Sequence, residues 1–307
     1  MRIAVIGAGG VGGGFGAALA KAGADVTFVA RGAHLAAMKR GGLKVKGPRG
    51  DTHLAPTQAT DNPAEIGAVD VVLFCVKLWD VESAGQAIKP LIGPDTAVIP
   101  LQNGVDAHER LLPILGGRAV MGGVAQISAS ITAPGEITQV GTFMRMIFGE
   151  LDGTRSKRAE NFLALCQAAG FDATLSEAIL TDLWMKFILL ASNAGMTALA
   201  RQPIGKLRDD PDMQPLFLSA YREVVAVGLA KGIALPADAV ETVVDFTNHF
   251  PPAMKASMAL DLERGNRLEV LWLSGKVAEL GKQYGIATPT HAMLYAMLKP
   301  YAMGSAG

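Results

Sequence analysis

The chain opens with an apolar run, a turn and a second apolar run. Met1–Ile6 is apolar except for Arg2 and leads into a glycine-rich turn, after which small and apolar residues continue as far as Gly23. Asp25–Ala30 forms the next apolar run. Two short apolar runs around a helix-like stretch predict a βαβ unit, with its helix over Phe15–Ala22.

Similar apolar runs recur along the next hundred residues. They cover Asp70–Val76, Thr96–Leu101 and Arg118–Ser128. Because they alternate with helical or loop stretches, they predict a parallel, doubly wound sheet of the α/β class. Two further runs, Gly135–Val140 and Phe143–Phe148, are separated by Gly141-Thr142, which predicts a hairpin closing the sheet edge.

From Ser156 onward the pattern becomes helical. A helix over Ser156–Ala169 precedes a last short strand at Phe171–Leu175. Glycines and prolines then bound a series of predicted helices: Glu177–Ala200, Met213–Lys231, Ala237–Asn248, Ser257–Arg264, Arg267–Tyr284 and His291–Leu298. We therefore expect a Rossmann-like nucleotide-binding domain over residues 1–176 and an all-helical domain over residues 177–307.

The turn after the first strand has the spacing of a dinucleotide-binding turn. It reads Gly7-Ala8-Gly9-Gly10-Val11-Gly12, a G-x-G-x-x-G pattern. The first glycine permits the tight turn, the second lets a pyrophosphate approach the backbone, and the third lets helix and strand pack closely. The helix N-terminus then faces the phosphates. The alternative is a tight turn in another kind of α/β protein.

Arg31 follows the second predicted strand, where an NAD-binding protein usually carries an acidic residue for the ribose 2′-hydroxyl. A guanidinium suits a 2′-phosphate instead, so the sequence predicts NADPH (or NADP) as cofactor. The alternative is a solvated arginine at a strand end. Lys39 and Arg40 lie close by, but they are more typical of ordinary surface charges.

Composition narrows the possible partners. Half of the 307 residues are apolar, which is enough for two cores, and 28 basic residues balance 28 acidic ones. No net field attracts nucleic acid or an anionic membrane, so we expect small molecules or further copies of the chain, as in a homodimer. Cys75 and Cys166 have neither metal nor disulfide spacing, which fits a reducing cytoplasm.

No export or membrane segment is expected. The first strand starts at residue 1, which leaves no room for a signal peptide. The most apolar helical segment, Phe187–Ala191, is interrupted on either side by Asp182, Lys186 and Asn193. It therefore predicts a buried core helix rather than a span of about 20 apolar residues.

Six segments, taken in order, carry a family resemblance. They are the glycine turn, Arg31, Cys75-Val76-Lys77, Leu101-Gln102-Asn103-Gly104-Val105, Trp184-Met185-Lys186-Phe187, and Ser257-Met258 with Asp261 and Glu269. This series resembles the ketopantoate reductases (2-dehydropantoate 2-reductases) over nearly the whole chain.

The resemblance implies an NADPH-dependent reduction of the C2 ketone of a 2-oxo acid. It implies a cleft between a Rossmann domain and a helical domain like the C-terminal domain of 6-phosphogluconate dehydrogenase. It also assigns cofactor contacts to Lys77 and Asn103, which follow predicted strands, where open α/β sheets bind ligands. On the residues alone, Asn103 is equally a turn residue before Gly104, and Lys77 a surface lysine.

Lys186 is the expected proton donor. A ketone that accepts hydride develops charge on its oxygen, and a lysine supplies both a proton and a cation. Its neighbours Trp184 and Phe187 are apolar, so we expect the pKa of Lys186 to shift toward working pH. The alternative is a lysine that snorkels from a buried helix.

The resemblance also implies a catalytic role for Glu269, as a carboxylate that interacts with the lysine and the substrate, and for Asn103. From the residues alone, Asn266-Arg267-Leu268-Glu269 has the spacing of a helix capping box, with Glu269 at its third helical position. The two roles of Glu269 do not exclude each other.

By resemblance, Ser257 binds the substrate carboxylate, and Asp261, one helical turn later, positions the site. The family typically has asparagines at three positions where this chain has Leu190, Ile204 and Met254. Asn193 lies seven residues after Lys186 on roughly the same helix face and is a candidate replacement. Lys255 is a candidate cation for a carboxylate.

Together these features predict a cytoplasmic NADPH-dependent reductase of a 2-oxo acid, with conversion of ketopantoate to pantoate in pantothenate biosynthesis as the first candidate. One alternative is a related reductase of a more apolar 2-oxo acid or an imine. The other is a catalytically silent dinucleotide-binding sensor. No metal site is expected.

Overall fold

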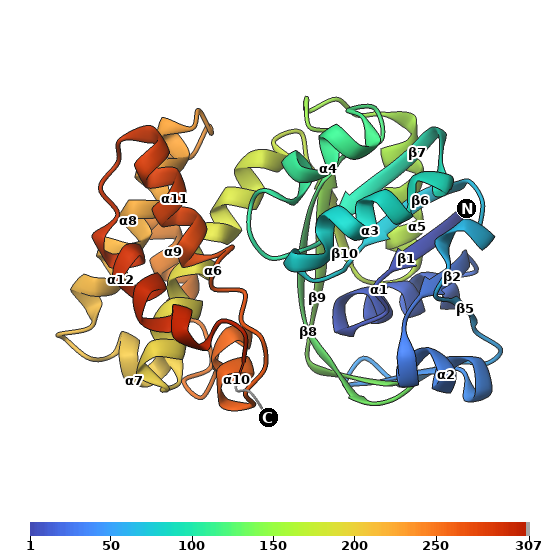
Figure 1. Cartoon of the computed structure of the whole chain (residues 1–307), viewed down its shortest axis with the longest axis horizontal. Coiled ribbons are helices and arrows are strands. Elements are labelled where there is room, and N and C mark those ends of the chain that lie inside the picture. The colour runs from blue at the N-terminus through green and yellow to red at the C-terminus, as the bar shows by residue number, and fades with distance from the viewer. Residues whose placement is uncertain (305–307) are drawn as a thin grey trace. The chain divides into compact units, whose positions relative to one another are not determined.

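The computed structural model describes residues 1–304 and divides into two compact units (Figure 1). The first comprises Met1–Gln102 and Asp106–Ile179, and the second comprises Asn103–Val105 and Leu180–Gly307. The main division therefore falls three residues beyond the expected one. A short segment, Asn103–Val105, also leaves the first unit and joins the second.

A five-stranded sheet forms the centre of the first unit. Its order is β5-β2-β1-β6-β7, and every pair is parallel. The strands are β1 (Arg2–Ile6), β2 (Asp25–Val29), β5 (Gln58–Thr60), β6 (Val69–Phe74) and β7 (Ile92–Pro100). Helices follow four of these strands: α1 (Gly10–Lys21) after β1, α2 (Gly32–Gly41) after β2, α3 (Val81–Ala87) after β6 and α4 (Ala107–Leu115) after β7. This confirms the predicted Rossmann-like α/β domain.

A second, mixed sheet holds the remaining strands, so the prediction of one sheet closed by a hairpin is wrong. Its strands are β3 (Leu43–Lys46), β4 (Thr52–Leu54), β8 (Gly122–Ala133), β9 (Glu136–Gly149) and β10 (Asp172–Leu175). The hairpin turn lies at Pro134-Gly135, between β8 and β9, rather than at Gly141-Thr142. Gly141, at φ +71°, instead lies inside β9, where the pairing with β8 skips from Met144 to Gln139.

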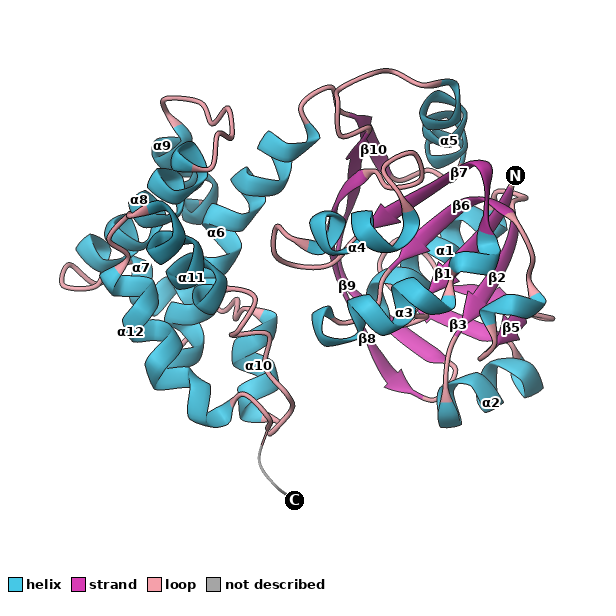
Figure 2. Ribbon diagram, turned by 45° about the horizontal axis from the view of Figure 1, so that its top comes forward, coloured by secondary structure: helices cyan, strands magenta, loops and turns pink. Residues whose placement is uncertain are grey.

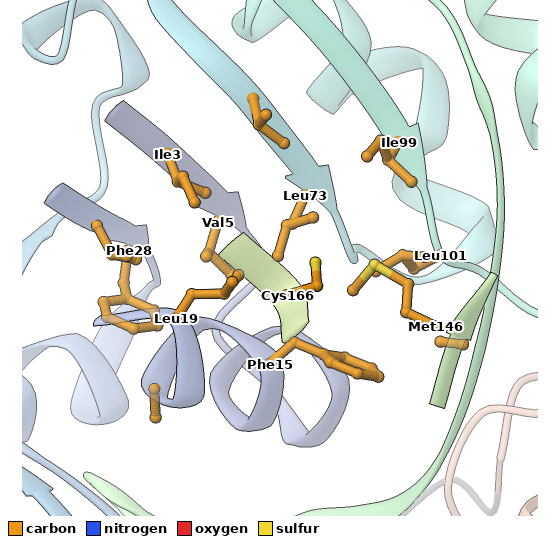
Figure 3. Packing of buried hydrophobic residues seen from close by; sticks show 14 of the residues in the cluster. Ile3, Val5, Phe15, Leu19, Phe28, Leu73, Ile99, Leu101, Met146 and Cys166 are labelled. Carbon is orange, nitrogen blue, oxygen red and sulfur yellow. The ribbon is translucent and has the colours of Figure 1, made fainter. Parts of the chain in front are cut away.

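The core of the first unit forms around α1. Phe15 and Leu19 of this helix are buried in the core, and Figure 3 shows Leu19 beside Val5 and the Phe15 ring on the side of Met146. Ile127 of β8 lies so close to α1 that a Cβ on Gly14 would come within 2.9 Å of it. Small residues along α1 thus allow strands of both sheets to pack closely against it. Helix α5 (Lys157–Ala168) contributes Phe162 and Cys166 to the same core.

The second unit is helical, and Figure 2 shows the described strands gathered in the first. Its helices are α6 (Ile179–Ala200, continuing from the first unit), α7 (Ile204–Arg208), α8 (Gln214–Ala230), α9 (Ala239–Asn248), α10 (Ser257–Glu263), α11 (Ser274–Tyr284) and α12 (Pro289–Leu298). The predicted helix Arg267–Tyr284 ends at the expected residue but begins later, at Ser274, because residues 266–269 are irregular and residues 270–273 form a turn. The described part of this unit thus matches the predicted all-helical domain.

Helix α6 provides much of the core of the second unit. Trp184 and Phe187 are each 1% exposed, and their rings meet edge to face at 5.7 Å between centroids. Among the described residues, α6 is the one helix long and apolar enough to span a membrane, contrary to the expectation that polar residues interrupt it. However, 67% of its most apolar window is buried inside the protein, as in a core helix.

Candidate active site

The glycine turn has the geometry that its spacing predicts. Gly7 has φ +95°, a conformation that favours glycine, and its N–H donates to the Val29 carbonyl at 3.1 Å. A Cβ on Gly12 would lie 2.2 Å from the Gly7 carbonyl oxygen, so an alanine there requires the turn to shift. Helix α1 begins at Gly10, and its first N–H groups lie next to the turn.

Gly9 provides the test of whether this turn fits a dinucleotide. Its φ of −76° is accessible to any residue, and a Cβ built on it would meet no heavy atom within 4 Å. Neither conformation nor packing within the fold therefore requires glycine here. Open space beside a glycine at a helix N-terminus fits a pyrophosphate that approaches the backbone closely.

Arg31 and Lys77 lie just beyond the carboxyl ends of β2 and β6, the two parallel strands that flank β1 in the sheet. Arg31 is the exposed N-cap residue of α2. Lys77 is exposed, and its Nζ lies 5.6 Å from the centroid of the Trp79 ring. Both residues lie where open α/β sheets bind ligands, and their contacts with a cofactor stay predictions.

Sequence reasoning missed Gln102, which links the ends of β6 and β7. Its buried side-chain amide donates to the Phe74 carbonyl at 2.8 Å and to the Val76 carbonyl at 3.1 Å. Gln102 thereby fixes the strand ends from which Lys77 and Asn103 continue. Its position immediately before Asn103, within the family-like segment, was the available signal.

A hydrogen-bonded cluster lies within the second unit. Lys186 Nζ on α6 donates to Asn103 Oδ1 at 3.3 Å, and Asn103 Nδ2 donates to Glu269 Oε2 at 3.2 Å. Asn103 is separated from Glu269 by 166 positions in the sequence. The structure thus brings together the three residues that we expected to be catalytic, although their roles stay predictions.

The electrostatics of Lys186 follow from its surroundings. Burial lowers its pKa from the usual 10.5 to about 8, because the apolar interior disfavours the charged amine, while Glu269 acts in the opposite direction. The Glu269 side chain is itself only 6% exposed. A lysine in this setting changes charge near neutral pH, which suits an acid–base group.

The capping-box interpretation of Glu269 is wrong. Helix α11 begins at Ser274, five residues beyond Glu269, so the carboxylate is not at its third position. Asn266 instead binds Asp261, through its N–H to the carbonyl at 2.8 Å and its Nδ2 to Oδ1 at 3.1 Å. Asn266 thus stabilises the turn after α10 rather than capping α11, and the Glu269 carboxylate accepts a hydrogen bond from Asn103.

The three residues expected to contact substrate lie in different surroundings. Ser257 is the exposed first residue of α10, and Asp261 holds the turn that follows this helix through Asn266. Asn193 is buried, and its Oδ1 accepts from the Tyr221 hydroxyl at 2.6 Å. Asn193 therefore belongs to a polar network between helices, and a contact with substrate stays a prediction for all three residues.

A cavity of about 1080 Å³ in the first unit lies at the other end of the parallel sheet. Met1 and Asp70, at the amino ends of β1 and β6, line it together with Arg118 and Arg158. None of the site residues expected from the sequence lines it. Ligands of open α/β sheets bind at the carboxyl ends of strands, so this cavity is not the candidate site.

Two family models match most of the chain. The model described as "Ketopantoate reductase PanE/ApbA" matches residues 3–153, and "Ketopantoate reductase PanE/ApbA C terminal" matches residues 178–302. The two matches correspond to the strand-rich and the helical part of the protein.

Individual proteins are similar over the full length. "Uncharacterized oxidoreductase YkpB" of Bacillus subtilis (strain 168) is 29% identical over 98% of this chain and 99% of its own. A 2-dehydropantoate 2-reductase of Mesorhizobium japonicum is 30% identical over 99% and 98%. The crystal structure of a PanE/ApbA family ketopantoate reductase from Ralstonia eutropha JMP134 has a TM-score of 0.90 at 29% identity, covering 98% of both chains. The chain therefore belongs to the ketopantoate reductase family and is an oxidoreductase of the 2-dehydropantoate 2-reductase type.

Proposed function

We propose that the protein reduces the ketone of a 2-oxo acid to a 2-hydroxy acid with NADPH, and that ketopantoate is its first candidate substrate. The observation that carries this proposal is the Lys186–Asn103–Glu269 cluster, with a lysine whose pKa lies at about 8. Intact acid–base machinery also argues against a silent dinucleotide sensor. Relatives named 2-dehydropantoate 2-reductase agree with this substrate class.

In this proposal a bound NADPH supplies the hydride to the carbonyl carbon. Lys186 Nζ gives a proton to the carbonyl oxygen, and the neutral amine regains a proton from water. Asn103 Oδ1 accepts from Nζ and so orients the amine, while the Asn103 amide is fixed by the Glu269 carboxylate. Glu269 also stabilises the protonated lysine that the step requires.

The choice of NADPH over NADH depends on Arg31. One charge-assisted contact to the 2′-phosphate contributes about 1.5–3 kcal/mol, or roughly 10- to 150-fold in kcat/KM. We expect Arg31→Asp to lose most of this preference. Arg40→Asp, at the exposed far end of the same helix, is the matched control and should keep it. Equal kcat/KM values for the two cofactors in the unmodified protein would refute the assignment.

A second candidate substrate class is a more apolar 2-oxo acid. Ile204 is buried, and its N–H donates to the Met254 carbonyl at 2.8 Å, so two of the three apolar replacements are neighbours. Lys255, the candidate cation, forms an ion pair with Glu263. A substrate hydroxyl placed against the side chains of Ile204 and Met254 would lose hydrogen bonds to water and gain none, which would weaken binding by about 1–3 kcal/mol. Each substrate methylene buried there instead strengthens binding by on the order of 0.8 kcal/mol.

A substrate panel at saturating NADPH distinguishes the two classes. We expect 2-oxo acids with branched or aromatic side chains to reach a kcat/KM at least comparable to that of ketopantoate. Met254→Asn should shift the ratio toward ketopantoate, whereas Met293→Asn, at a similarly exposed methionine of α12, should not. If the kcat/KM for ketopantoate exceeds that for the apolar 2-oxo acids by about two orders of magnitude, the apolar substrate class is refuted and ketopantoate remains the candidate substrate.

A further inference from the structure

His34 of α2 connects three segments of the first unit. Its Nε2 lies 2.9 Å from the carbonyl oxygen of Ala8, inside the glycine turn. Its Nδ1 lies 3.0 Å from the N–H of Gly135, in the turn between β8 and β9. Three residues earlier, the same helix has Arg31 as its N-cap. One imidazole thus holds together the phosphate-binding turn, the helix with the expected 2′-phosphate contact, and the hairpin.

These partners require one form of the ring. The Gly135 N–H can only donate, so Nδ1 must be the unprotonated acceptor. The Ala8 carbonyl can only accept, so Nε2 must bear the proton. A protonated imidazolium would place an N–H against the N–H of Gly135 and lose that hydrogen bond. Only the neutral ring satisfies both partners.

We propose that His34 is a positioning residue for the dinucleotide, whose neutral imidazole holds the glycine turn in the form that binds the phosphates. The inference rests on the proposed dinucleotide site. In the imidazolium Nε2 still donates to Ala8, but the two opposed N–H groups push the ring away from Gly135, and the Ala8 carbonyl and the turn around Gly9 shift with the ring. Cofactor affinity is then linked to the protonation of His34 and falls in acid.

In the contact of His34 with Ala8 and Gly135, the imidazole is the one group that titrates, since both partners are backbone groups. The glycine turn and β5, which pack against α2, carry no ionisable side chain. The neighbouring segments carry ionisable groups at the following residues: the α2 N-cap Arg31, Lys39 and Arg40 of α2, Glu136 and Arg145 of β9, Lys44 and Lys46 of β3, which pair with Glu136, and His53 of β4, which binds the Gly41 carbonyl. Burial lowers the pKa of His34 from its usual value, against the smaller effect of the Ala8 hydrogen bond.

The test is calorimetric titration with NADP⁺, which is stable in acid, between about pH 5 and pH 8. His34→Gln keeps an amide that donates and accepts but does not titrate. We expect the ratio of Kd at the acid end to Kd at the alkaline end to be at least roughly threefold larger in the unmodified protein than in His34→Gln. The 2′-phosphate titrates equally in both proteins, so the difference isolates the imidazole.

Two variants complete the experiment. His53→Gln replaces an exposed imidazole of β4 that binds only the Gly41 carbonyl among described residues, and should follow the unmodified protein. His34→Ala loses both hydrogen bonds, and should bind NADP⁺ roughly tenfold more weakly even at the alkaline end.

Parallel plots of log Kd against pH for the unmodified protein and His34→Gln would overturn the proposal, as would variants that lose thermal stability while Kd stays unchanged. A protein that binds NADP⁺ but reduces no 2-oxo acid would contradict the proposed function and leave this inference standing. A protein that binds no NADP⁺ near pH 8 would overturn both.

Discussion

Replacement of Glu269 by glutamine isolates the charge that opposes the effect of burial on Lys186. The side chain keeps its size and still accepts from Asn103 Nδ2, but the negative charge is gone. With hydrogen bonds of 3.3 and 3.2 Å on the two ends of the Asn103 amide, the charges lie on the order of 7 Å apart. At an effective dielectric constant of about 20 their attraction is about 2.4 kcal/mol.

This energy corresponds to a fall of about one to two in the pKa of Lys186. Because the unmodified pKa is about 8, most of the lysine is protonated at neutral pH, and that fraction is lost as the pH rises through the pKa. In Glu269→Gln the loss begins at lower pH. We expect kcat/KM to fall about three- to twentyfold near pH 7.5, and less than about threefold near pH 6.

The assay is the pH profile of kcat/KM for the 2-oxo acid at saturating NADPH, which reports the protein before it binds that substrate. Glu279→Gln, at an exposed carboxylate of α11 that pairs with Lys276, is the control and should leave the profile in place. A uniform loss of activity with the alkaline limb unmoved would refute the electrostatic role of Glu269.

Three further outcomes follow from the geometry. Lys186→Ala should lower kcat by about 10² to 10⁴, with NADPH affinity in equilibrium titrations nearly unchanged; near-full turnover would reduce Lys186 to a packing residue. Gly9→Ala should leave the midpoint of thermal unfolding unchanged or slightly raised, because its Cβ meets no atom, yet weaken dinucleotide binding at least about tenfold, whereas Gly12→Ala should unfold more easily. Burial lowers the pKa of His291 to about 4, so as the pH falls the unfolded chain binds a proton at this residue before the folded protein does. The free energy of unfolding should therefore fall as the pH drops from about 6.5 toward 4, by up to about 1.4 kcal/mol per pH unit. Denaturant unfolding at several pH values should show a weaker pH dependence of this free energy in His291→Gln.

The glycine turn could be predicted residue by residue because its constraints are local. Gly7 needs a positive φ and Gly12 a close approach to Gly7, and both lie within six positions of each other. The hairpin could not be predicted in the same way. Both Pro134-Gly135 and Gly141-Thr142 have turn chemistry, and only the pairing of β8 with β9 decides which of them reverses the chain.

The cluster around Lys186 shows the same limit for the site. Its apolar setting follows from Trp184 and Phe187 on the same helix, so the lowered pKa could be anticipated. The partners could not, since Asn103 and Glu269 come from distant parts of the chain and entered only through the family resemblance. Asn193 was predicted from helix periodicity alone, which says nothing of Tyr221 on α8.

The segment Asn103–Val105 has a consequence for how this protein can be recombined. Although it follows β7, it belongs with the helices, where Asn103 satisfies the buried carboxylate of Glu269. A chimaera joined at 179–180, with its Rossmann half taken from a relative, would import the relative's loop into the helical half. The exchangeable module is therefore discontinuous in the gene, and a working graft must carry the codons of this tripeptide together with those of the C-terminal half.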